Sequence, residues 1–583
     1  MPFRRPSVLV CGSEPLASRV VAGLRADGRA VAPIALETLA GPARLRIRTL
    51  VLADPPDPAA VMAALQERRR RQRAGLGRHQ IRLVLMHRGE TPPALPPLAE
   101  SQTWLRVETF AIEERAARAV LTRWPLHAGM DPPFGQVPHL VLVGTGELAH
   151  AFLVQSLRLI QYGGARPRVT RLSAEPDATA SRLRTRLPHA GQVAELCCGH
   201  LAEPPLTGAP PVTLVLVCPD ADEDSILADT TRLARRIAEQ QSVSPPILLE
   251  VGEHEPAGEL ADWDGQILAF SALREVCRAG VLLDGVGDEV AQTIHEHYCD
   301  SIAAQGRDPT GEPAGQPWSH LATSYREANR HQADHLWAKL AVTDCTAVAE
   351  EMVDSFAFAP LEVERLALIE HQRWAADRHL DGWSYAETRD NARKHHPQLI
   401  PYASLSEPMK DLDRFAVRGV PALLARSGLG ILRRLILAVP EPGPQAPTGI
   451  WLRRLVRQVL ERLVSRYPDR ALVVAATLGD ATVRHLVRQA TEQAGAAFFW
   501  LQPEPVGDLL AAQPDRAARL DLLALGARAE RRIALAGNAE LTRWFAERAE
   551  ILCLIGKCPA PPAPRKRVEL VRAWQGVSWN FDY

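Results

Sequence analysis

The residues best suited to hold a ligand in this chain of 583 residues are aromatic, amide and basic side chains between positions 366 and 418. Only 5% of the chain is aromatic, yet tryptophan and tyrosine gather here beside arginine, lysine and asparagine. Aromatic rings stack on nucleobases, asparagine pairs with a base edge, and basic groups bind phosphate. The predicted ligand-binding residues are Arg373, Trp374, Trp383, Tyr385, Arg389, Asn391, Lys394 and Tyr402. The structural alternative makes both tryptophans core anchors and the basic residues a solvated rim.

A second candidate site is the turn Gly144–Ala149, which reads GTGELA between a predicted strand and a predicted helix. Gly144 permits a tight turn, Gly146 lets a phosphate approach the backbone, and Ala149 lets helix and strand pack closely. The next strand ends in Ser173, where dinucleotide sites use an acid for the ribose, so Glu175 would have to replace it. The turn is therefore expected either to bind a nucleotide such as NAD or to be purely structural.

Weaker glycine turns occur near both ends of the chain. Gly479 and Asp480 follow a predicted strand and open a helix, which makes them candidate nucleotide-binding residues. The first turn, Gly12–Ala17, has Glu14 where a second glycine is expected, and a carboxylate there would repel a pyrophosphate. The chain lacks the GxSxG, Walker, HExxH and deaminase motifs, so no catalytic or metal-binding residue is predicted.

Several rare motifs occur in a fixed order around the aromatic residues. They are EHxRW (370–374), DGW (381–383), RDN (389–391), HPxLxPY (396–402) and LSEPMKDLDR (405–414). In this order they resemble the repeat domain named after the ryanodine receptors, and with the preceding helix the resemblance covers residues 318–428. It implies a binding or assembly module without chemistry of its own, in which some members hold an adenine nucleotide between aromatic side chains.

Two further segments resemble nucleotide-binding families. Residues 138–270 resemble the TrkA-N/RCK domains that regulate potassium channels and transporters. Residues 430–583, with AATLGDATVRHLV, AAFFWLQPEP and WFAERAEILCLIG, resemble the SLOG class of Rossmann-like domains. The PGGxGTxxE motif of the phosphoribohydrolase members is absent, so this resemblance implies binding rather than hydrolysis.

The elements that must position these residues alternate between strand and helix over most of the chain. Predicted strands are 7–11, 49–53, 82–87, 105–109, 139–143, 168–172, 212–217, 247–251, 435–439, 471–475, 497–501, 532–535 and 551–555. The pattern predicts a multidomain α/β protein with doubly wound Rossmann-like units at 1–128 and 138–270. A helical connector (271–304), a Gly/Pro-rich linker (305–316), the helical module (318–428) and a third α/β unit (430–583) follow.

Within the helical module, a helical hairpin is expected to hold the aromatic loop. One helix runs through Leu366 and Ile369 and ends near Gly382. The second starts at Glu407, and its apolar residues Met409, Leu412, Phe415 and Val417 are expected to face the first.

Composition restricts the classes of function. The chain is 46% hydrophobic and 23% charged, with 68 basic and 68 acidic residues, so no global field attracts nucleic acid. It shows no membrane-length apolar run and no signal-peptide pattern, and its nine cysteines lack metal-site spacing. We therefore expect a cytoplasmic protein without membrane insertion or direct nucleic-acid binding.

These features predict a cytosolic nucleotide-binding sensor or regulator, with NAD and adenine nucleotides as candidate ligands, and the tandem units suggest a homodimer. One alternative is an enzyme that processes nucleotides through the C-terminal unit, with Asp480 or a nearby carboxylate as general base. Another is a soluble regulatory subunit of a potassium transporter or channel, which requires a membrane-protein or effector partner.

Overall fold

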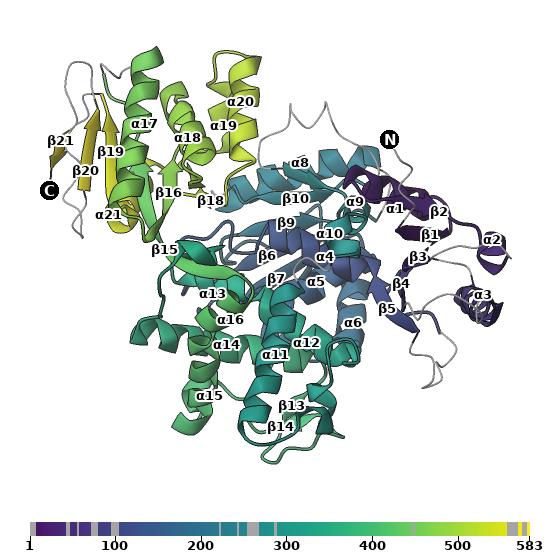
Figure 1. Ribbon diagram of the computed structural model, residues 1–583. Helices are drawn as coiled ribbons and strands as arrows, with labels where there is room; N and C mark the ends of the chain where they lie inside the picture. The colour runs from purple at the N-terminus through teal and green to yellow at the C-terminus, as the bar shows by residue number, and fades with distance from the viewer. Residues whose placement is uncertain are drawn as a thin grey trace.

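The computed structural model describes residues 7–41, 47–54, 57–71, 80–94, 104–220, 223–241, 244–252, 267–284, 288–444, 446, 449–556, 569–573 and 580–582. These residues form three largely parallel sheets with flanking helices, together with a helical module (Figure 1). The predicted multidomain α/β class is confirmed.

The first α/β unit has a parallel sheet of order β2-β1-β3-β4-β5, one of the two common doubly wound orders. Apolar residues fill both faces, among them Val10, Leu50 and Leu85. Its elements are β1 (Val8–Gly12), α1 (Leu16–Ala26), β2 (Val31–Pro33), α2 (Leu36–Ala40), β3 (Thr49–Ala53), α3 (Pro58–Arg71), β4 (Ile81–His87), β5 (Leu105–Ala111) and α4 (Ile112–Arg123).

The second unit has the strand order β8-β7-β6-β9-β10-β11, which is that of dinucleotide-binding folds. The order reverses between β6 and β9, so their carboxyl ends form the crevice where such folds bind ligands. The elements are β6 (His139–Val143), α5 (Glu147–Leu159), β7 (Arg168–Ser173), α6 (Pro176–Arg186), α7 (Ala190–Val193), β8 (Glu195–His200), β9 (Leu214–Val217), α8 (Glu223–Gln241), β10 (Ile247–Glu250) and β11 (Ile267–Phe270).

The connector and helical module follow as α9 (Ala272–Val276), α10 (Ala279–Leu282), α11 (Glu289–Ala304), α12 (Thr323–Asp334), α13 (Leu336–Val342), β12 (Cys345–Ala349), α14 (Pro360–Leu380), β13 (Ser384–Tyr385), β14 (His395–His396), α15 (Glu407–Arg418) and α16 (Val420–Arg426). The predicted linker holds two 3-10 turns, Pro309–Gly311 and Pro313–Gly315. Gln316 accepts a hydrogen bond from buried His295 of α11 through its carbonyl oxygen. The connection is therefore packed against α11.

The hairpin of α14 and α15 forms as predicted, but α15 presents a different face to α14. Leu366 and Ile369 are fully buried on α14, whereas Leu412 and Phe415 are 63% and 66% exposed on α15. Asp413 and Arg414 of α15 instead contact His371 and Glu364 of α14. The prediction that Leu412 and Phe415 face α14 is wrong, because paired charges occupy the facing stripe.

The C-terminal unit shares a strand with the helical module. The first half of β15 (Leu429–Val439) pairs antiparallel with β12, and its second half pairs parallel with β16 and β19. The remaining elements are α17 (Gly449–Arg466), β16 (Arg470–Ala476), α18 (Ala481–Gln493), β17 (Ala497–Gln502), α19 (Val506–Ala511), α20 (Arg516–Gly526), β18 (Arg531–Ala534), α21 (Asn538–Arg548), β19 (Ile551–Ile555), β20 (Glu569–Ala573) and β21 (Asn580–Asp582).

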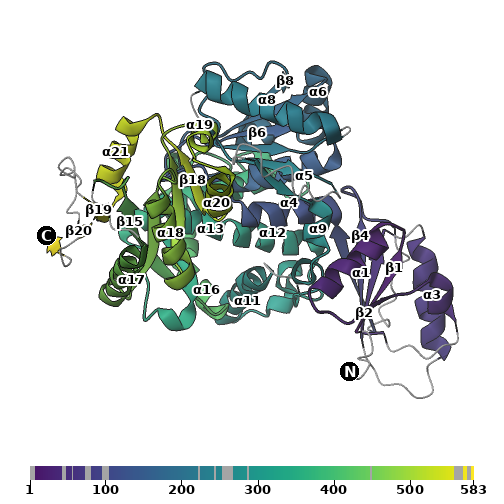
Figure 2. The ribbon, with the colours of Figure 1, turned by 90° about the horizontal axis from the view of Figure 1, so that it is seen from above.

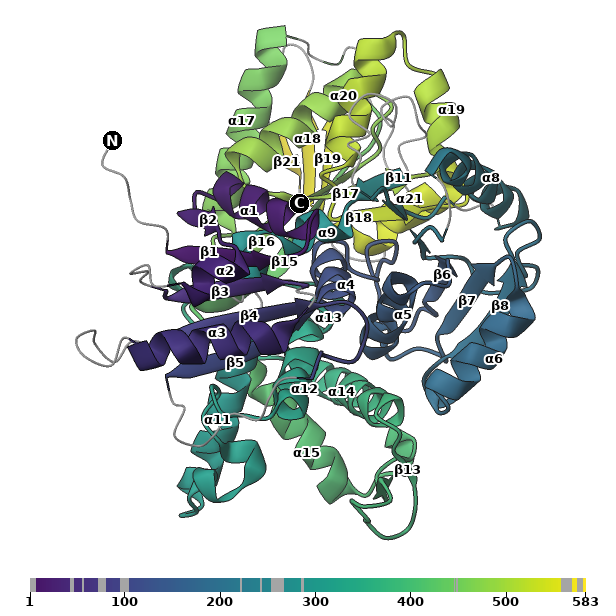
Figure 3. The same cartoon turned by 90° about the vertical axis from the view of Figure 1, so that its right-hand side faces the viewer.

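The units pack around shared helices. Figure 2 shows α4, α12 and α13 between the first unit and the C-terminal unit. Figure 3 shows the loop at β13 at the opposite end of the molecule from the C-terminal unit. One apolar cluster joins the first unit, the second unit and the module, including Leu24, Leu140 and Leu366. None of the helices in the described ranges combines the length and apolar character that crossing a bilayer requires.

Candidate functional site

Three of the four predicted aromatic residues of the helical module form a row of rings together with two histidines. In order, the row is Tyr402, His371, Trp374, His396 and Trp383, with centroid separations of 5.9, 5.6, 4.9 and 6.1 Å. His396 therefore lies between the two tryptophans. The Trp383 Nε1 donates to Asp381 at 3.0 Å, and the Tyr402 hydroxyl donates to Glu364 at 3.0 Å.

Arg373 lies in a buried ion-pair cluster rather than on the ligand-facing rim. Its Nη2 donates to Glu370 Oε1 at 2.7 Å, and the Nζ of fully buried Lys339 lies 2.7 Å from Glu370 Oε2. Burial opposes the charge on Glu370, yet Arg373 and Lys339 together hold its pKa well below the usual range. The guanidinium of Arg373 is thus neutralised by Glu370 within α14.

The other four predicted residues of the module lie together on the exposed loop around the β13–β14 pair. Tyr385 is 53% exposed, and the Arg389 Nε donates to the side-chain oxygen of Asn391 at 2.9 Å. The Lys394 Nζ donates to the backbone oxygen of Asp381 at 2.6 Å. This rim offers polar groups to solvent beside Trp374 and Trp383.

The glycine turn of the second unit has the predicted backbone, and a carboxylate of the protein itself binds its amides. Gly144 has φ +114°, and a Cβ there would lie 2.0 Å from the Cys218 carbonyl oxygen, so the close approach requires glycine. Ala149 is buried where α5 packs on the sheet. The backbone amides of Thr145 and Gly146 donate to Asp220 at 2.6 and 2.8 Å. The carboxylate of Asp220 thus binds the amides that a pyrophosphate would use.

The polar side chains where a ribose would bind also pair with other groups of the protein. Ser173 is buried and its hydroxyl lies 2.9 Å from the Thr179 hydroxyl, whereas Glu175 is exposed. A small hollow of about 150 Å³ beside α5 and α6 is lined by Arg171 and Arg186, among others. Arg186 forms a two-bond pair with Glu147 at 2.9 and 3.0 Å. The structure therefore brings Gly144, Gly146 and Ala149 together in one turn, and Asp220 accepts the hydrogen bonds of the Thr145 and Gly146 amides.

Asp480 of the C-terminal unit caps its own helix. Its Oδ1 accepts from the amides of Thr482 and Val483 at 2.6 and 3.3 Å, which satisfies the first turn of α18. Gly479 lies beside Leu509 and Glu441, and burial raises the pKa of Glu441, helped by the charge of Asp480. The carboxyl ends of these strands therefore present acidic groups, which do not favour phosphate.

A larger cavity, of about 1280 Å³, lies between the first unit, the connector and α12. One wall comes from β4, β5 and α4, and the other from α9, α10 and α12. Its lining includes the aromatic residues Trp318 and Trp337. Six of the arginines that line it are Arg82, Arg106, Arg115, Arg118, Arg326 and Arg330.

The cavity arginines differ in how their charge is balanced. Arg118 is fixed by Asp334 and Asp288 at 2.7 Å each. Arg326, by contrast, has no hydrogen bond or ion pair within the described part of the chain, and its Nε is buried. Burial and the neighbouring Arg330 lower the pKa of Arg326. Arg326 is therefore a partly buried cation without a contacting counter-ion.

Sequence reasoning did not identify this cavity. Arg326 lies in the segment YREANR (325–330), within the helix that precedes the ordered motifs, and the opposite wall lies some two hundred residues earlier in the chain. A detectable signal was the cluster of Arg326 and Arg330 beside Trp318. Basic residues on a helix that follows closely after a tryptophan are the same combination of residue types that marks the loop.

Comparison with solved structures gives low overall similarity. Aspartate transcarbamoylase from Trypanosoma cruzi, in complex with carbamoyl phosphate and aspartate, is 12% identical with a TM-score of 0.25, covering 48% of this chain and 84% of that chain. A putative aspartate carbamoyltransferase from the same organism gives 13%, a TM-score of 0.26 and the same coverage. D-mandelate dehydrogenase from Rhodotorula graminis gives 13% and 0.19, covering 47% and 89%.

Comparison with protein families gives a match within the helical module. Residues 361–433 match the family model described as RyR domain. The match begins in α14, includes the aromatic row and the exposed loop, and ends within β15. The RyR part of the sequence resemblance is therefore confirmed, and the TrkA-N/RCK and SLOG resemblances stay predictions.

Proposed function

We propose that this protein is a regulatory protein that binds a nucleotide-class anion in the cavity between the first α/β unit and α12. The RyR domain and the Rossmann-like folds fit a regulatory role. The observation that carries the proposal is the guanidinium of Arg326, which has no contacting counter-ion among the described residues and lines a cavity of about 1280 Å³ that also has tryptophan in its lining.

The cavity lining holds as many acidic residues as arginines, and a phosphate matches the guanidinium of Arg326 within it. Glu108 and Glu327 act on Arg326 without contacting it, and a phosphate would supply a contacting counter-ion. Charge-assisted hydrogen bonds contribute about 1.5–3 kcal/mol each. Arg115 adds a second cation, since its own ion-pair distances to Glu327 and Asp288 are long, at 3.6 and 3.9 Å. Trp318 and Trp337 offer apolar surface for a base.

The two glycine turns are weaker candidates for the same ligand. Asp220 and Asp480 already bind the helix-terminal amides, so a phosphate would have to displace a carboxylate. The exposed loop of the RyR domain, with Tyr385, Arg389, Asn391 and Lys394, remains a second proposed contact surface. It supplies donors, whereas Arg373 and Tyr402 are used internally.

Ligand binding in the cavity has a physical route to the rest of the molecule. A ligand bridging β5 and α12 changes the balance of contacts between the first unit and the module. α12 continues into α13 and β12, and β12 pairs with β15 of the C-terminal unit. The predicted homodimer and effector partner would respond to this change, and both remain proposals.

The test is thermal unfolding of the full chain with NAD, ADP, ATP and cyclic dinucleotides, for wild type and Arg326→Ala. A ligand at one hundred times its Kd adds about 2.7 kcal/mol and raises the Tm. We expect Arg326→Ala to abolish the rise. Arg393→Ala, on the exposed loop, is the matched control and should retain it.

A double variant, Tyr385→Ala with Arg389→Ala, separates the two possible sites. If this variant abolishes the ligand-induced rise in Tm and Arg326→Ala does not, the ligand binds the loop and the cavity proposal is wrong. If none of the nucleotides raises the Tm of wild type, the proposal is also contradicted. Sedimentation of wild type with and without the active ligand then tests whether assembly changes.

A further inference from the structure

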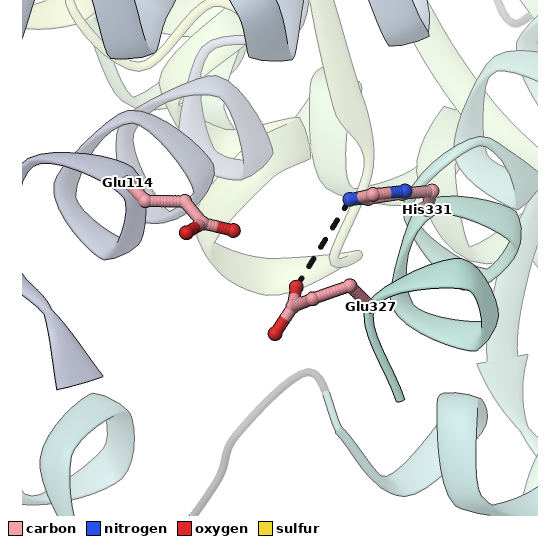
Figure 4. A group of neighbouring side chains, drawn as sticks. All are labelled: Glu114, Glu327 and His331. Atoms are coloured by element: carbon pink, nitrogen blue, oxygen red, sulfur yellow. Dashed lines mark ion pairs between the residues drawn. The ribbon is translucent and has the colours of Figure 1, made fainter. Parts of the chain in front are cut away.

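Three side chains that can bind a metal converge where α4 meets α12. Glu114 comes from α4, while Glu327 and His331 lie four residues apart on α12, so they share one helix face. One ligand atom from each side chain lies within 4.8 Å of the others. Figure 4 shows the two carboxylates and the imidazole directed toward one another.

His331 is held in the orientation that a metal ligand requires. Its side chain is only 7% exposed, and its Nδ1 lies 2.8 Å from Asp377 Oδ1. The Nε2 is buried without a hydrogen-bond partner in the described part of the chain and lies 4.0 Å from Glu327 Oε2. A carboxylate on one ring nitrogen, with the other nitrogen left for the metal, is the usual arrangement around metal-binding histidines.

The two glutamates leave oxygen atoms available to a cation. Glu327 Oε1 is engaged by Arg330 and, at 3.6 Å, by Arg115, whereas Oε2 faces His331. Glu114 forms no hydrogen bond or ion pair among the residues that the structure describes. Two carboxylates thus face an imidazole nitrogen that has no described hydrogen-bond partner. Together these three groups can act as ligands of one metal ion.

We propose that Glu114, Glu327 and His331 bind a divalent first-row transition-metal ion, such as Mn²⁺ or Zn²⁺. Metal–ligand bonds of about 2.0–2.2 Å place ligand atoms roughly 3–3.5 Å apart, so modest side-chain rotations complete the set. The imidazole ligand suits Zn²⁺, and the two carboxylates suit Mn²⁺. Asp288 and Asp334 balance Arg118 nearby, which limits repulsion of the ion by that arginine.

The site would open toward the large cavity. Glu114 and Glu327 both line that cavity, so coordination positions not used by protein can be taken by water or by an oxygen of a bound molecule. The metal proposal does not depend on a nucleotide, because its three named ligands all belong to the protein. Its test therefore needs only the metal.

The experiment is calorimetric titration of Mn²⁺ and Zn²⁺ into full-length protein stripped with a chelator, with Mn²⁺ binding also followed by electron paramagnetic resonance. We expect one ion per chain and at least about tenfold weaker binding in Glu114→Gln and His331→Gln. Asp377→Asn should weaken binding about 10–100-fold by releasing the imidazole. His320→Gln, which removes an exposed histidine, should bind as wild type.

Folding controls keep the result interpretable. Glu114→Gln is nearly isosteric and removes no described partner, so its metal-free Tm should equal that of wild type. One equivalent that binds equally well to Glu114→Gln and His331→Gln would place the ion elsewhere and overturn the proposal. Absence of binding to the wild-type protein, or binding lost equally in His320→Gln, would also overturn it.

Discussion

Internal pairing decides which arginines can meet a ligand. Arg373 and Arg326 both belong to helices of the same module, and both are basic residues near tryptophans. Arg373 has Glu370 one turn earlier and is neutralised by it, whereas no contacting carboxylate is described for Arg326. The i,i+3 spacing of Glu370 and Arg373 was visible in the sequence, but Lys339, which fixes the pair inside the protein, comes from a distant helix.

Glu250 gives a pH-dependent prediction at the scale of one residue. Burial raises its pKa from the ordinary 4.5 to about 7, although hydrogen bonds from the Ala272 and Gly252 amides oppose the shift. The folded state then holds the proton more tightly than the unfolded state does. The stability from this group is fully present below about pH 4.5 and is lost as pH rises to about 7.

Glu250→Gln keeps an oxygen acceptor for the Ala272 amide and removes the titration. We expect its Tm to exceed that of wild type above pH 7, with the difference shrinking as pH falls toward 5. Thermal unfolding across this range measures it. Exposed Glu296→Gln is the control, and a difference from wild type that is constant with pH would show that Glu250 is ionised throughout.

At the scale of elements, strand positions were largely predictable because buried strands are short apolar runs between helices. The strands His139–Val143 and Ile551–Ile555 form at the predicted residues. Which face of α15 packs against α14 was not predictable. The spacing of Leu412 and Phe415 fits an apolar stripe on the packed face, and it fits equally well on the exposed face. What decides is the pairing of Arg414 with Glu364, fifty residues away in the chain.

The candidate sites were predictable to a smaller extent than the strands. The backbone of the Gly144 turn follows from its first glycine, because the close approach of Gly144 to the Cys218 carbonyl excludes a side chain. Its occupation by Asp220 did not follow, since strand order determines which loop lies opposite the turn. Only the placement of β9 beside β6 brings Asp220 to these amides.

The start of α5 gives a prediction about that occupation. Asp220→Ala should lower the free energy of unfolding by about 0.5–2 kcal/mol, because it removes the group that satisfies the Thr145 and Gly146 amides. It should also let NAD or inorganic phosphate raise the Tm more than in wild type. Asp354→Ala, an exposed control, should change neither quantity.

The ligand response of Asp220→Ala is the decisive part of this test. If the variant is destabilised but responds to neither NAD nor phosphate, the turn is structural and the carboxylate serves only as a cap. If its stability equals that of wild type, the contacts to Asp220 contribute little in solution.

At the scale of the whole molecule, the units are joined by charges far apart in sequence. Arg118 of α4 pairs with Asp288 before α11 and with Asp334 of α12, which connects the first unit to the module. Asp131, after α4, accepts hydrogen bonds from Arg531 and Arg548 of the C-terminal unit. No local pattern predicts a pair separated by 400 residues.

Asp131 is therefore the residue whose loss should most weaken docking of the C-terminal unit. Its side chain and that of Arg531 are fully buried, and it also accepts from Trp544 Nε1 at 3.0 Å. Asp131→Ala leaves Arg531 buried without this partner, which typically costs about 3–5 kcal/mol. We expect a lower Tm and faster proteolysis between the module and the C-terminal unit.

Exposed Asp411→Ala is the control and should cost less than about 1 kcal/mol of stability. Equal Tm values for the two variants would mean that apolar packing and the β12–β15 pairing, rather than this charge network, hold the C-terminal unit in place.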